Sequence, residues 1–277
     1  MQRFSFSNNR GKTRFMGIIN ISTDSFYEKS RCYSINEVLA TAQKMISEGA
    51  DYLDLGAESS RPGSKPISDQ EEIDKLIPVL SSLVKKVEIP ISVDTYKPAV
   101  AHEALQSGAK FINDIRGLQK TSEMAEVISR FNAGVVIMHM NGSPLTMQEN
   151  PKYENVVNDV KKFLAKSIKI AEKAGILPDQ IAVDPGIGFG KSQKDNLDIL
   201  NNLEKFTELE KPILLGVSRK SFIGNILNLP PEGRLEGSLA ASAIGVYKGV
   251  SILRTHDVKA TRKAIKVVES IIQGENM

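Results

Sequence analysis

Short apolar segments of this chain end, one after another, in polar side chains whose types could together perform chemistry. One polar residue at such a position means little, since Asp and Asn commonly begin turns. A polar residue at the end of each of eight segments indicates a shared site. These residues are Asn20, Asp54, Asp94, Asn113, His139, Asp184, Ser218 with Lys220, and Arg254 with His256.

The set is suited to a flat, polar ring that carries phosphate. Carboxylates accept paired N–H bonds, a carboxamide both donates and accepts, and an ammonium group donates to a carbonyl oxygen. Two aspartates, an asparagine and a lysine could therefore bind a heterocycle with an amide-like edge. Arg61, Arg254 and His256 could bind phosphate, because a guanidinium can donate to two oxygens. For Asp54 and His139, a structural role in pairing buried polar groups is an equal alternative.

The stretch VDPGIGFGKS, residues 183–192, has part of a phosphate-binding pattern. The full pattern, G-x-x-x-x-G-K-[ST], would need glycine where Pro185 stands. No acidic residue stands at the offset that a dinucleotide site would need. We interpret the glycines as places where backbone passes close to a flat ligand and side chains would collide. Lys191 is interpreted as a solvated lysine at the edge of this loop.

The composition is that of an ordinary globular protein, with 41% of the 277 residues hydrophobic and 25% charged. A net charge of +3 gives no support for nucleic-acid binding, although a pI of about 8.8 does not repel an anionic substrate. The single cysteine, Cys32, excludes an intrachain disulfide and a thiolate metal cluster. No signal peptide or membrane-spanning run is evident. We expect a cytoplasmic protein that binds neither nucleic acid nor membrane.

The polar residues need elements to position them, and strand-like segments alternate with helical patterns along the chain. A helix over 34–50 has a possible capping box between Ser34 and Glu37. A helix over 97–109 has Pro98 near its start and Gly108 at its end. The strand-like segments, rich in Ile, Val and Leu, are 14–20, 52–57, 91–95, 111–115, 134–140, 181–186, 212–218 and 250–256.

Eight strand–helix units predict a single α/β domain over 1–277, with a core of about 14–272, folded as a (β/α)8 TIM barrel. A doubly wound sheet is the alternative architecture. In a barrel, alternate strand residues point inward and functional groups gather at the C-terminal mouth of the strands. Ser92 and Asp94 fall on one face of their segment, as do Ile252, Arg254 and His256. This shared direction favours the barrel.

Six motifs closely resemble the dihydropteroate synthase family, in order and over nearly the whole chain. Members join a hydroxymethyl-dihydropterin diphosphate to 4-aminobenzoate, giving dihydropteroate and diphosphate for folate synthesis. The motifs are GADYLDLGAESSRPGS (49–64), SVDTYKPAVAHEALQSGAKFINDI (92–115), MHMNGSPLTMQ (138–148), VDPGIGFGKSQKDN (183–196), GVSRKSFIG (216–224) and LRTHDV (253–258). The resemblance implies a TIM barrel, a transferase that uses Mg²⁺ and is a sulfonamide target, and a homodimer.

The same resemblance, carried over motif by motif, implies where each substrate binds. The residues implied to bind the pterin ring are Asp94, Asn113, Asp184 and Lys220. Asn20 is implied to bind Mg²⁺ with the diphosphate, which Arg61, Arg254 and His256 contact. The aminobenzoate side is implied to be formed by Ser60, Arg61, Pro62, Ser218 and the backbone at Gly188 and Phe189.

The implied catalytic residues are Asp94, Lys220, Arg254 and His256. In the family's reaction, the arylamine attacks the pterin methylene carbon as diphosphate departs. Mg²⁺ with Arg254 and His256 would neutralise the leaving group. Asp94 would favour a cationic, pterin-like transition state. The aromatic amine needs only orientation, and no Ser–His or Cys–His pair suggests a covalent nucleophile.

The first loop departs most from the family pattern. Residues 20–26 read NISTDSF where the family usually has NVTPDSF, so Ser22 and Thr23 differ, and 27–30 read YEKS in place of a Ser-Asp-Gly-Gly run. How this loop closes is therefore open. Ser60 stands for a usual threonine and keeps the hydroxyl, and Asn141 for a usual glutamine and keeps the carboxamide.

Two other functions are alternatives. A methyltransferase that passes a methyl group from methyltetrahydrofolate to a corrinoid would keep the pterin-binding Asp and Asn residues. It would not need the Arg61-Pro62-Gly63 and Ser218-Arg219-Lys220 motifs, which are present. A homologue that binds the pterin without catalysis is supported only by the altered first loop.

Overall fold

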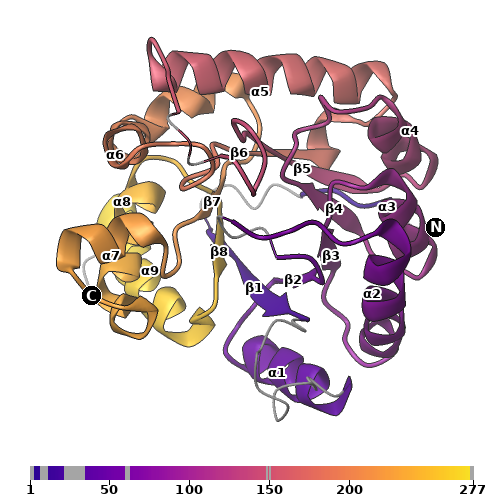
Figure 1. The fold of residues 1–277 in the computed structure, drawn as a ribbon. Coiled ribbons are helices and arrows are strands. Elements are labelled where there is room, and N and C mark those ends of the chain that lie inside the picture. Colours follow the sequence, from indigo (N-terminus) through magenta and orange to yellow (C-terminus); the bar gives the residue numbers. More distant parts are fainter. Residues whose placement is uncertain are drawn as a thin grey trace.

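The computed structural model describes residues 3–6, 12–21, 35–59, 63–147, 149 and 151–274. Eight parallel strands alternate with helices, and the helices follow one another round the outside of the strands (Figure 1). The strands are β1 (Arg14–Asn20), β2 (Tyr52–Gly56), β3 (Ile91–Asp94), β4 (Phe111–Asp114), β5 (Gly134–Met138), β6 (Ile181–Asp184), β7 (Leu214–Gly216) and β8 (Ile252–Thr255).

The helices begin and end where local sequence signals favour it. The helix expected over 34–50 is present as α1, although Ser34 lies outside the described residues. Pro98 occupies the first turn of α3, and Gly108 beyond its end has a φ of +110°. The α-helices are α1 (Ile35–Ser47), α2 (Asp69–Val84), α3 (Pro98–Gln106), α4 (Glu123–Arg130), α5 (Val156–Lys173), α6 (Gln193–Asn201), α7 (Ser221–Leu227), α8 (Leu235–Tyr247) and α9 (Val258–Gln273).

The strands close into a barrel. Their order in the sheet is β6-β5-β4-β3-β2-β1-β8-β7, so β6 and β7 are the two edges. An isolated parallel bridge between Val183 and Ile213 joins these edges, and the Val183 N–H donates to the Pro212 carbonyl oxygen at 2.9 Å. The predicted (β/α)8 barrel is therefore confirmed, and the doubly wound alternative is wrong.

Apolar and polar residues follow each other along the inward face of the strands. Tyr52 precedes Asp54, Phe111 precedes Asn113, and Ile252 precedes Arg254, each two residues apart. The apolar members form a buried cluster near the start of the strands: Phe4, Phe6, Met16, Tyr52, Phe111, Val136, Ala182, Leu214 and Ile252. Because strand side chains alternate between faces, the next inward position on these strands carries the polar residues toward the C-terminal mouth.

A second and larger apolar core fills the space between the strands and the surrounding helices. Leu53, Leu55 and Val93 on the outward strand faces pack in it with Leu76, Leu80 and Leu83 of α2. In the described part of the chain, no helix has the length and apolarity needed to cross a bilayer.

Candidate active site

An arginine bridging two carboxylates lies at the centre of the barrel mouth. Arg254 projects from β8, and its Nε donates to Asp54 Oδ2 on β2 at 2.5 Å. Its Nη2 donates to Asp94 Oδ2 at the end of β3, at 2.9 Å. The three strands thereby place one cation and two anions in contact.

Asp54 connects this centre to Asn113. Asp54 is fully buried and accepts from Ser92 Oγ, from Arg254 and from Asn113 Nδ2 at 3.3 Å. These contacts favour the structural interpretation of Asp54, which orients its neighbours. Asn113 Oδ1 is buried and accepts no hydrogen bond from any described residue. It is therefore an acceptor available to an N–H group of a ligand.

Burial and neighbouring charges change the acidity of this centre. Burial raises the pKa of Asp94 to about 7, with Arg254 opposing the rise and Asp54 adding to it. For Arg254, burial acts to lower the pKa, but Asp54 and Asp94 outweigh it and raise the pKa above its ordinary value. Arg254 is therefore a permanent cation, whereas Asp94 changes charge near neutral pH.

A lysine and an aspartate form the second part of the mouth. Lys220 precedes α7, donates to the Ile187 carbonyl oxygen, and has its Nζ 4.7 Å from the centre of the Phe189 ring. Asp184 ends β6 and accepts from the Gly186 N–H at 2.7 Å. Burial lowers the pKa of Lys220 to about 8, and the charge of Asp184 opposes this. Burial also raises the pKa of Asp184, which Lys220 opposes.

Ser218 and His256 join the ends of β7 and β8. The Ser218 Oγ and His256 Nδ1 atoms are 3.0 Å apart, and the His256 N–H donates to Ser218 Oγ at 3.3 Å. Next to Ser218, Arg219 has a φ of +57° and forms an ion pair with Asp257. The Arg219–Asp257 ion pair joins the loops that follow β7 and β8. The His256 imidazole is exposed at the rim of the mouth.

Asn20 ends β1 opposite Gly56 of β2 and is exposed. The Cβ position that Gly56 lacks lies 3.5 Å from Asp94 Cβ and 3.9 Å from Asn20 Oδ1. The carboxamide oxygen of Asn20 therefore leans over the mouth beside Asp94.

The structure places ten of the sequence-predicted site residues around this mouth, and three lie outside the described residues. Those three are Ser60, Arg61 and Pro62. The departure from the family pattern in the first loop, at 22–30, also lies outside the described residues. The ten at the mouth or in the loops that border it are Asn20, Asp94, Asn113, Asp184, Gly188, Phe189, Ser218, Lys220, Arg254 and His256.

The loop after β6 differs from the sequence interpretation in one residue. Lys191 is not solvated: it is 2% exposed, and its Nζ donates to the carbonyl oxygens of Gly186 at 2.8 Å and Phe189 at 3.0 Å. The Nζ also lies 2.9 Å from His139 Nδ1. The interpretation of Lys191 as a surface lysine is wrong because the loop curls inward over its own ammonium group.

The glycines of this loop are required by packing against the chain after β5. Gly186 has a φ of +70°, and a Cβ there would lie 1.9 Å from the His139 carbonyl oxygen. Gly190 has a φ of +63°, and its Cβ would lie 2.3 Å from the Asn141 carbonyl oxygen. At Gly188, with a φ of +84°, the nearest atom is Lys220 Cδ at 3.4 Å. Packing against the chain after β5 therefore explains the glycines at 186 and 190, and close approach of a ligand is left as a reason for glycine only at 188.

A buried ion cluster that the sequence interpretation did not identify lies beside the loop after β2. Lys97 Nζ donates to Glu58 Oε2 at 2.6 Å, to Glu72 Oε2 at 2.7 Å and to the Ile67 carbonyl oxygen at 2.7 Å. Tyr96 OH donates to Glu58 Oε1 at 2.7 Å. The cluster joins the two ends of the segment that carries residues 59–66. Glu58, Tyr96 and Lys97 all lie within the matched motifs over 49–64 and 92–115, and this was the signal that could have identified the cluster.

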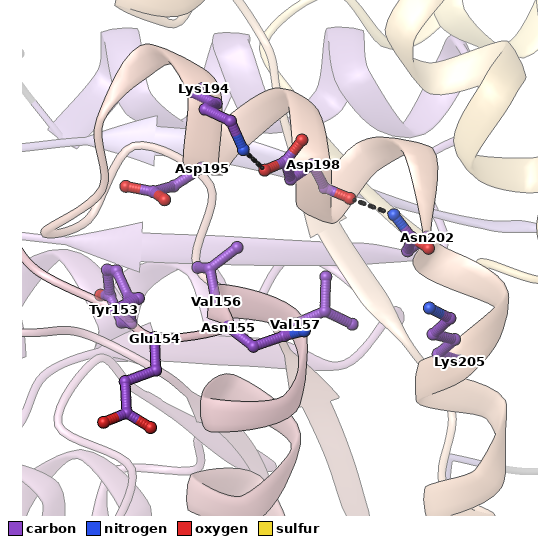
Figure 2. Close-up of a pocket in the computed structure, with 10 residues that line it drawn as sticks. All are labelled: Tyr153, Glu154, Asn155, Val156, Val157, Lys194, Asp195, Asp198, Asn202 and Lys205. Atoms are coloured by element: carbon purple, nitrogen blue, oxygen red, sulfur yellow. Dashed lines mark hydrogen bonds and ion pairs between the residues drawn. The ribbon is translucent and has the colours of Figure 1, made fainter.

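The described surface also has a hollow of about 380 Å³ away from the strand ends (Figure 2). It lies between the start of α5 and α6 and contains none of the predicted site residues. Lys194 and Asp198 on its wall form an ion pair with each other. Within the described residues, no group of three His, Cys, Asp or Glu side chains could bind a metal ion.

Known proteins resemble this chain over almost its whole length. The family model described as pterin binding enzyme matches residues 16–256. The dihydropteroate synthase of Bacillus subtilis is 42% identical over 261 residues, which are 94% of this chain and 89% of that protein. A crystal structure of the Yersinia pestis dihydropteroate synthase with a sulfonamide drug complex has a TM-score of 0.89 and 39% identity, covering 95% of each chain. The Xanthomonas albilineans dihydropteroate synthase with 4-aminobenzoic acid has a TM-score of 0.88 and 38% identity, covering 96% of this chain and 94% of that one.

Proposed function

The chain belongs to the pterin-binding enzyme family, and we infer that within this family it is a dihydropteroate synthase. It is a transferase of folate synthesis that joins 6-hydroxymethyl-7,8-dihydropterin diphosphate to 4-aminobenzoate, and it is a target of sulfonamides. The observation that carries this inference is the convergence of Asp94, Asn113, Asp184 and Lys220 at one barrel mouth.

We propose that these four side chains bind the pterin ring. Asn113 Oδ1 and the carboxylates of Asp94 and Asp184 would accept the ring N–H groups, and the Lys220 ammonium would donate to its carbonyl oxygen. As diphosphate leaves, positive charge develops on the pterin, and ionised Asp94 would stabilise it. This role needs Asp94 deprotonated and Lys220 protonated.

The leaving diphosphate is proposed to lie against Arg254 and His256. Contacts with Asp54 and Asp94 use two of the five guanidinium N–H groups of Arg254, so others can donate to phosphate oxygens. The His256 side chain is exposed at the rim beside Ser218 and can donate to the same group. Arg61, which lies outside the described residues, is the third proposed phosphate contact.

The aminobenzoate is proposed to bind beside the loop after β6, next to Gly188, Phe189 and Ser218, with Ser60, Arg61 and Pro62 completing this side. The Xanthomonas albilineans relative with 4-aminobenzoic acid supports this substrate. Because an arylamine is already a competent nucleophile, the loop needs only to orient it toward the methylene carbon.

Mg²⁺ fits the donor chemistry at the end of β1. The Asn20 carboxamide oxygen beside Asp94 is a hard oxygen ligand, and Mg²⁺ is typically bound by one or two protein oxygens together with substrate phosphates. We propose that Asn20 binds the ion with the diphosphate. The bound ion would neutralise charge on the leaving group.

We also propose that the protein is cytoplasmic and a homodimer. Large apolar side chains are exposed on α8 and α9, which pack against each other: Ile244, Tyr247, Val267, Ile271 and Ile272. An exposed apolar face of this kind supports association. Sedimentation of the purified protein measures the dimer, and a concentration-independent monomer would contradict it.

The activity is tested by incubating the protein with both substrates and Mg²⁺ and measuring dihydropteroate and released diphosphate. Omitting 4-aminobenzoate is the control and should abolish the product. Binding of the pterin diphosphate with no release of diphosphate would identify a catalytically inactive homologue. Methyl transfer that depends on a corrinoid would identify the methyltransferase alternative.

A further inference from the structure

Lys191 is a buried lysine that has no place in the mechanism above. Burial lowers the pKa of Lys191 to about 7, and the charge of Asp184 opposes this, so its ammonium form prevails below that pH. Its Nζ has three acceptors: Gly186 O at 2.8 Å, Phe189 O at 3.0 Å and His139 Nδ1 at 2.9 Å. A fourth oxygen, His139 O, lies at 3.4 Å. A lysine ammonium has three donors and no acceptor, so these contacts use all of its hydrogen-bonding capacity.

The contacts of Lys191 favour one protonation state of its neighbour His139, the neutral imidazole. While Lys191 is protonated its Nζ can only donate, so His139 Nδ1, 2.9 Å away, accepts and carries no proton. Burial and the charge of Lys191 lower the pKa of His139 to about 2, which keeps the imidazole neutral. The imidazole is enclosed by the Phe163 ring, 4.8 Å away between ring centres at 84°. Lys191 therefore donates to a rigid acceptor on the chain after β5.

The two carbonyl groups that accept from Lys191, those of Gly186 and Phe189, belong to the same turn as the Ile187 carbonyl group that faces Lys220. Gly186 and Phe189 flank Ile187, whose carbonyl oxygen accepts from the Lys220 ammonium. The Phe189 ring lies 4.7 Å from the same ammonium. Two further contacts hold the outer side of the loop: Tyr153 OH donates to Gly190 O at 2.6 Å, and Asn196 Oδ1 accepts from the Gly188 N–H at 2.7 Å.

We propose that Lys191 is a positioning residue for the mouth: its ammonium holds the Gly186–Phe189 turn so that Ile187 O and the Phe189 ring orient Lys220 and the aminobenzoate side. Lys191 touches neither substrate and acts through this turn. The inference rests on the proposed function and adds a residue to it. An apolar side chain of equal length could fill the space but could not donate to these three acceptors. Gly186 O would keep the Phe189 N–H at 3.1 Å, whereas His139 Nδ1 and Phe189 O would lose the Lys191 donor.

The test uses Lys191→Ala, Lys191→Met and the matched control Lys194→Ala. Lys194 lies three residues further on at the start of α6, is exposed, and is paired only at the surface with Asp198 (Figure 2). Lys191→Ala leaves room for n-propylammonium, which replaces the missing atoms, and Lys191→Met retains the volume without the donors. Steady-state rates are measured for both substrates across pH, with and without n-propylamine.

We expect both Lys191 variants to lose on the order of tenfold to a hundredfold in kcat/KM for 4-aminobenzoate, as small misplacements of binding groups do. The alkaline limb of the pH profile changes position, because Lys191, whose pKa burial lowers to about 7, no longer contributes its own titration to that limb. n-Propylammonium restores both properties in Lys191→Ala and neither in Lys191→Met. Lys194→Ala keeps the parent values.

Parent-like KM and pH profile in folded Lys191→Met would overturn the proposal. Loss of activity that n-propylammonium does not restore in folded Lys191→Ala would overturn it as well. Failure of both variants to fold would assign Lys191 to the fold itself, which also contradicts a positioning role. If the parent protein makes no dihydropteroate, the proposed function fails instead, and that result is separate from these.

Discussion

At the scale of single residues, the mouth contains charges that offset one another before any ligand binds. Arg254 faces Asp54 and Asp94, and Lys220 lies in the field of Asp184. A buried charge is tolerated only with such partners. The proposed pterin contacts involve Asp94 and Lys220 of these same pairs, which makes the protonation states of the two residues decisive.

The pH dependence of kcat/KM for the pterin diphosphate should be bell-shaped. Burial raises the pKa of Asp94 to about 7, so Asp94 loses its charge and activity falls as the pH drops through 7. Burial lowers the pKa of Lys220 to about 8, so activity falls again as the pH rises above 8. Rates measured across this range give the two limbs as properties of the coupled mouth.

Variants assign the two limbs of this profile. Asp94→Asn should remove the acidic limb and lower turnover by roughly a hundredfold or more, the usual cost of a lost transition-state charge contact. Lys220→Met should remove the part of the alkaline limb that lies near pH 8. A parent profile that is flat from pH 6 to 9, or near-full turnover in Asp94→Asn, would contradict the charge roles given to these residues.

At the scale of elements, the alternation of side chains along the strands made most of the site predictable. Asp94, Asn113, Asp184 and Arg254 come at or near the ends of β-patterned segments, and parallel strands bring such ends to one mouth. The burial of Lys191 could not be predicted in this way. It depends on the directions of carbonyl groups in a turn with three glycines at positive φ, which no periodicity in the sequence reports.

Gly186→Ala tests the close packing of this turn. A Cβ at Gly186 would lie 1.9 Å from the His139 carbonyl oxygen, and φ is +70°, so both overlap and backbone strain oppose the change. We expect a loss of more than about 2 kcal/mol in the free energy of unfolding, measured with urea.

The matched control for Gly186→Ala is Gly63→Ala. Gly63 has a similar φ of +82°, but a Cβ there meets nothing within 4 Å among the described atoms. Gly63→Ala should lower the free energy of unfolding only by the cost of a left-handed backbone conformation at a non-glycine residue, about 1 kcal/mol. Equal losses in the two variants would show that the contact with His139 is not what requires glycine at 186.

The buried Glu58–Lys97–Glu72 cluster gives a second prediction at this scale. Lys97→Met would leave two carboxylates without their shared cation, and burial already raises the pKa of Glu72. We expect the free energy of unfolding to fall by about 3–5 kcal/mol, as when one partner of a buried ion pair is removed. Lys75→Met, which removes an i,i+4 pair with the more exposed Glu71, should change it by less than about 1 kcal/mol.

At the scale of the whole molecule, the two ends of the barrel have separate tasks. The C-terminal mouth carries the polar site, and the opposite end is filled by aromatic rings. Phe4 stacks on Phe111 with ring centres 4.8 Å apart, and Phe6 meets both Phe111 and Tyr52 edge to face. Phe4 and Phe6 lie before residue 14, so the periodic strand pattern from which the core was predicted could not include them.

The separation of the two ends predicts that stability and substrate binding can be changed independently. Phe4 is 8% exposed, and Phe4→Ala would empty space between Phe111, Tyr52 and the bare backbone of Gly134. We expect a loss of about 3–5 kcal/mol in the free energy of unfolding, as for other buried Phe truncations. At temperatures where the variant stays folded, KM for both substrates should be unchanged, because the strands between the rings and the mouth keep their pairing.

Leu197→Ala, at an exposed position on α6, is the control and should change the free energy of unfolding by less than about 0.5 kcal/mol. A raised KM in folded Phe4→Ala would show that the rings at the base help to set the geometry of the mouth.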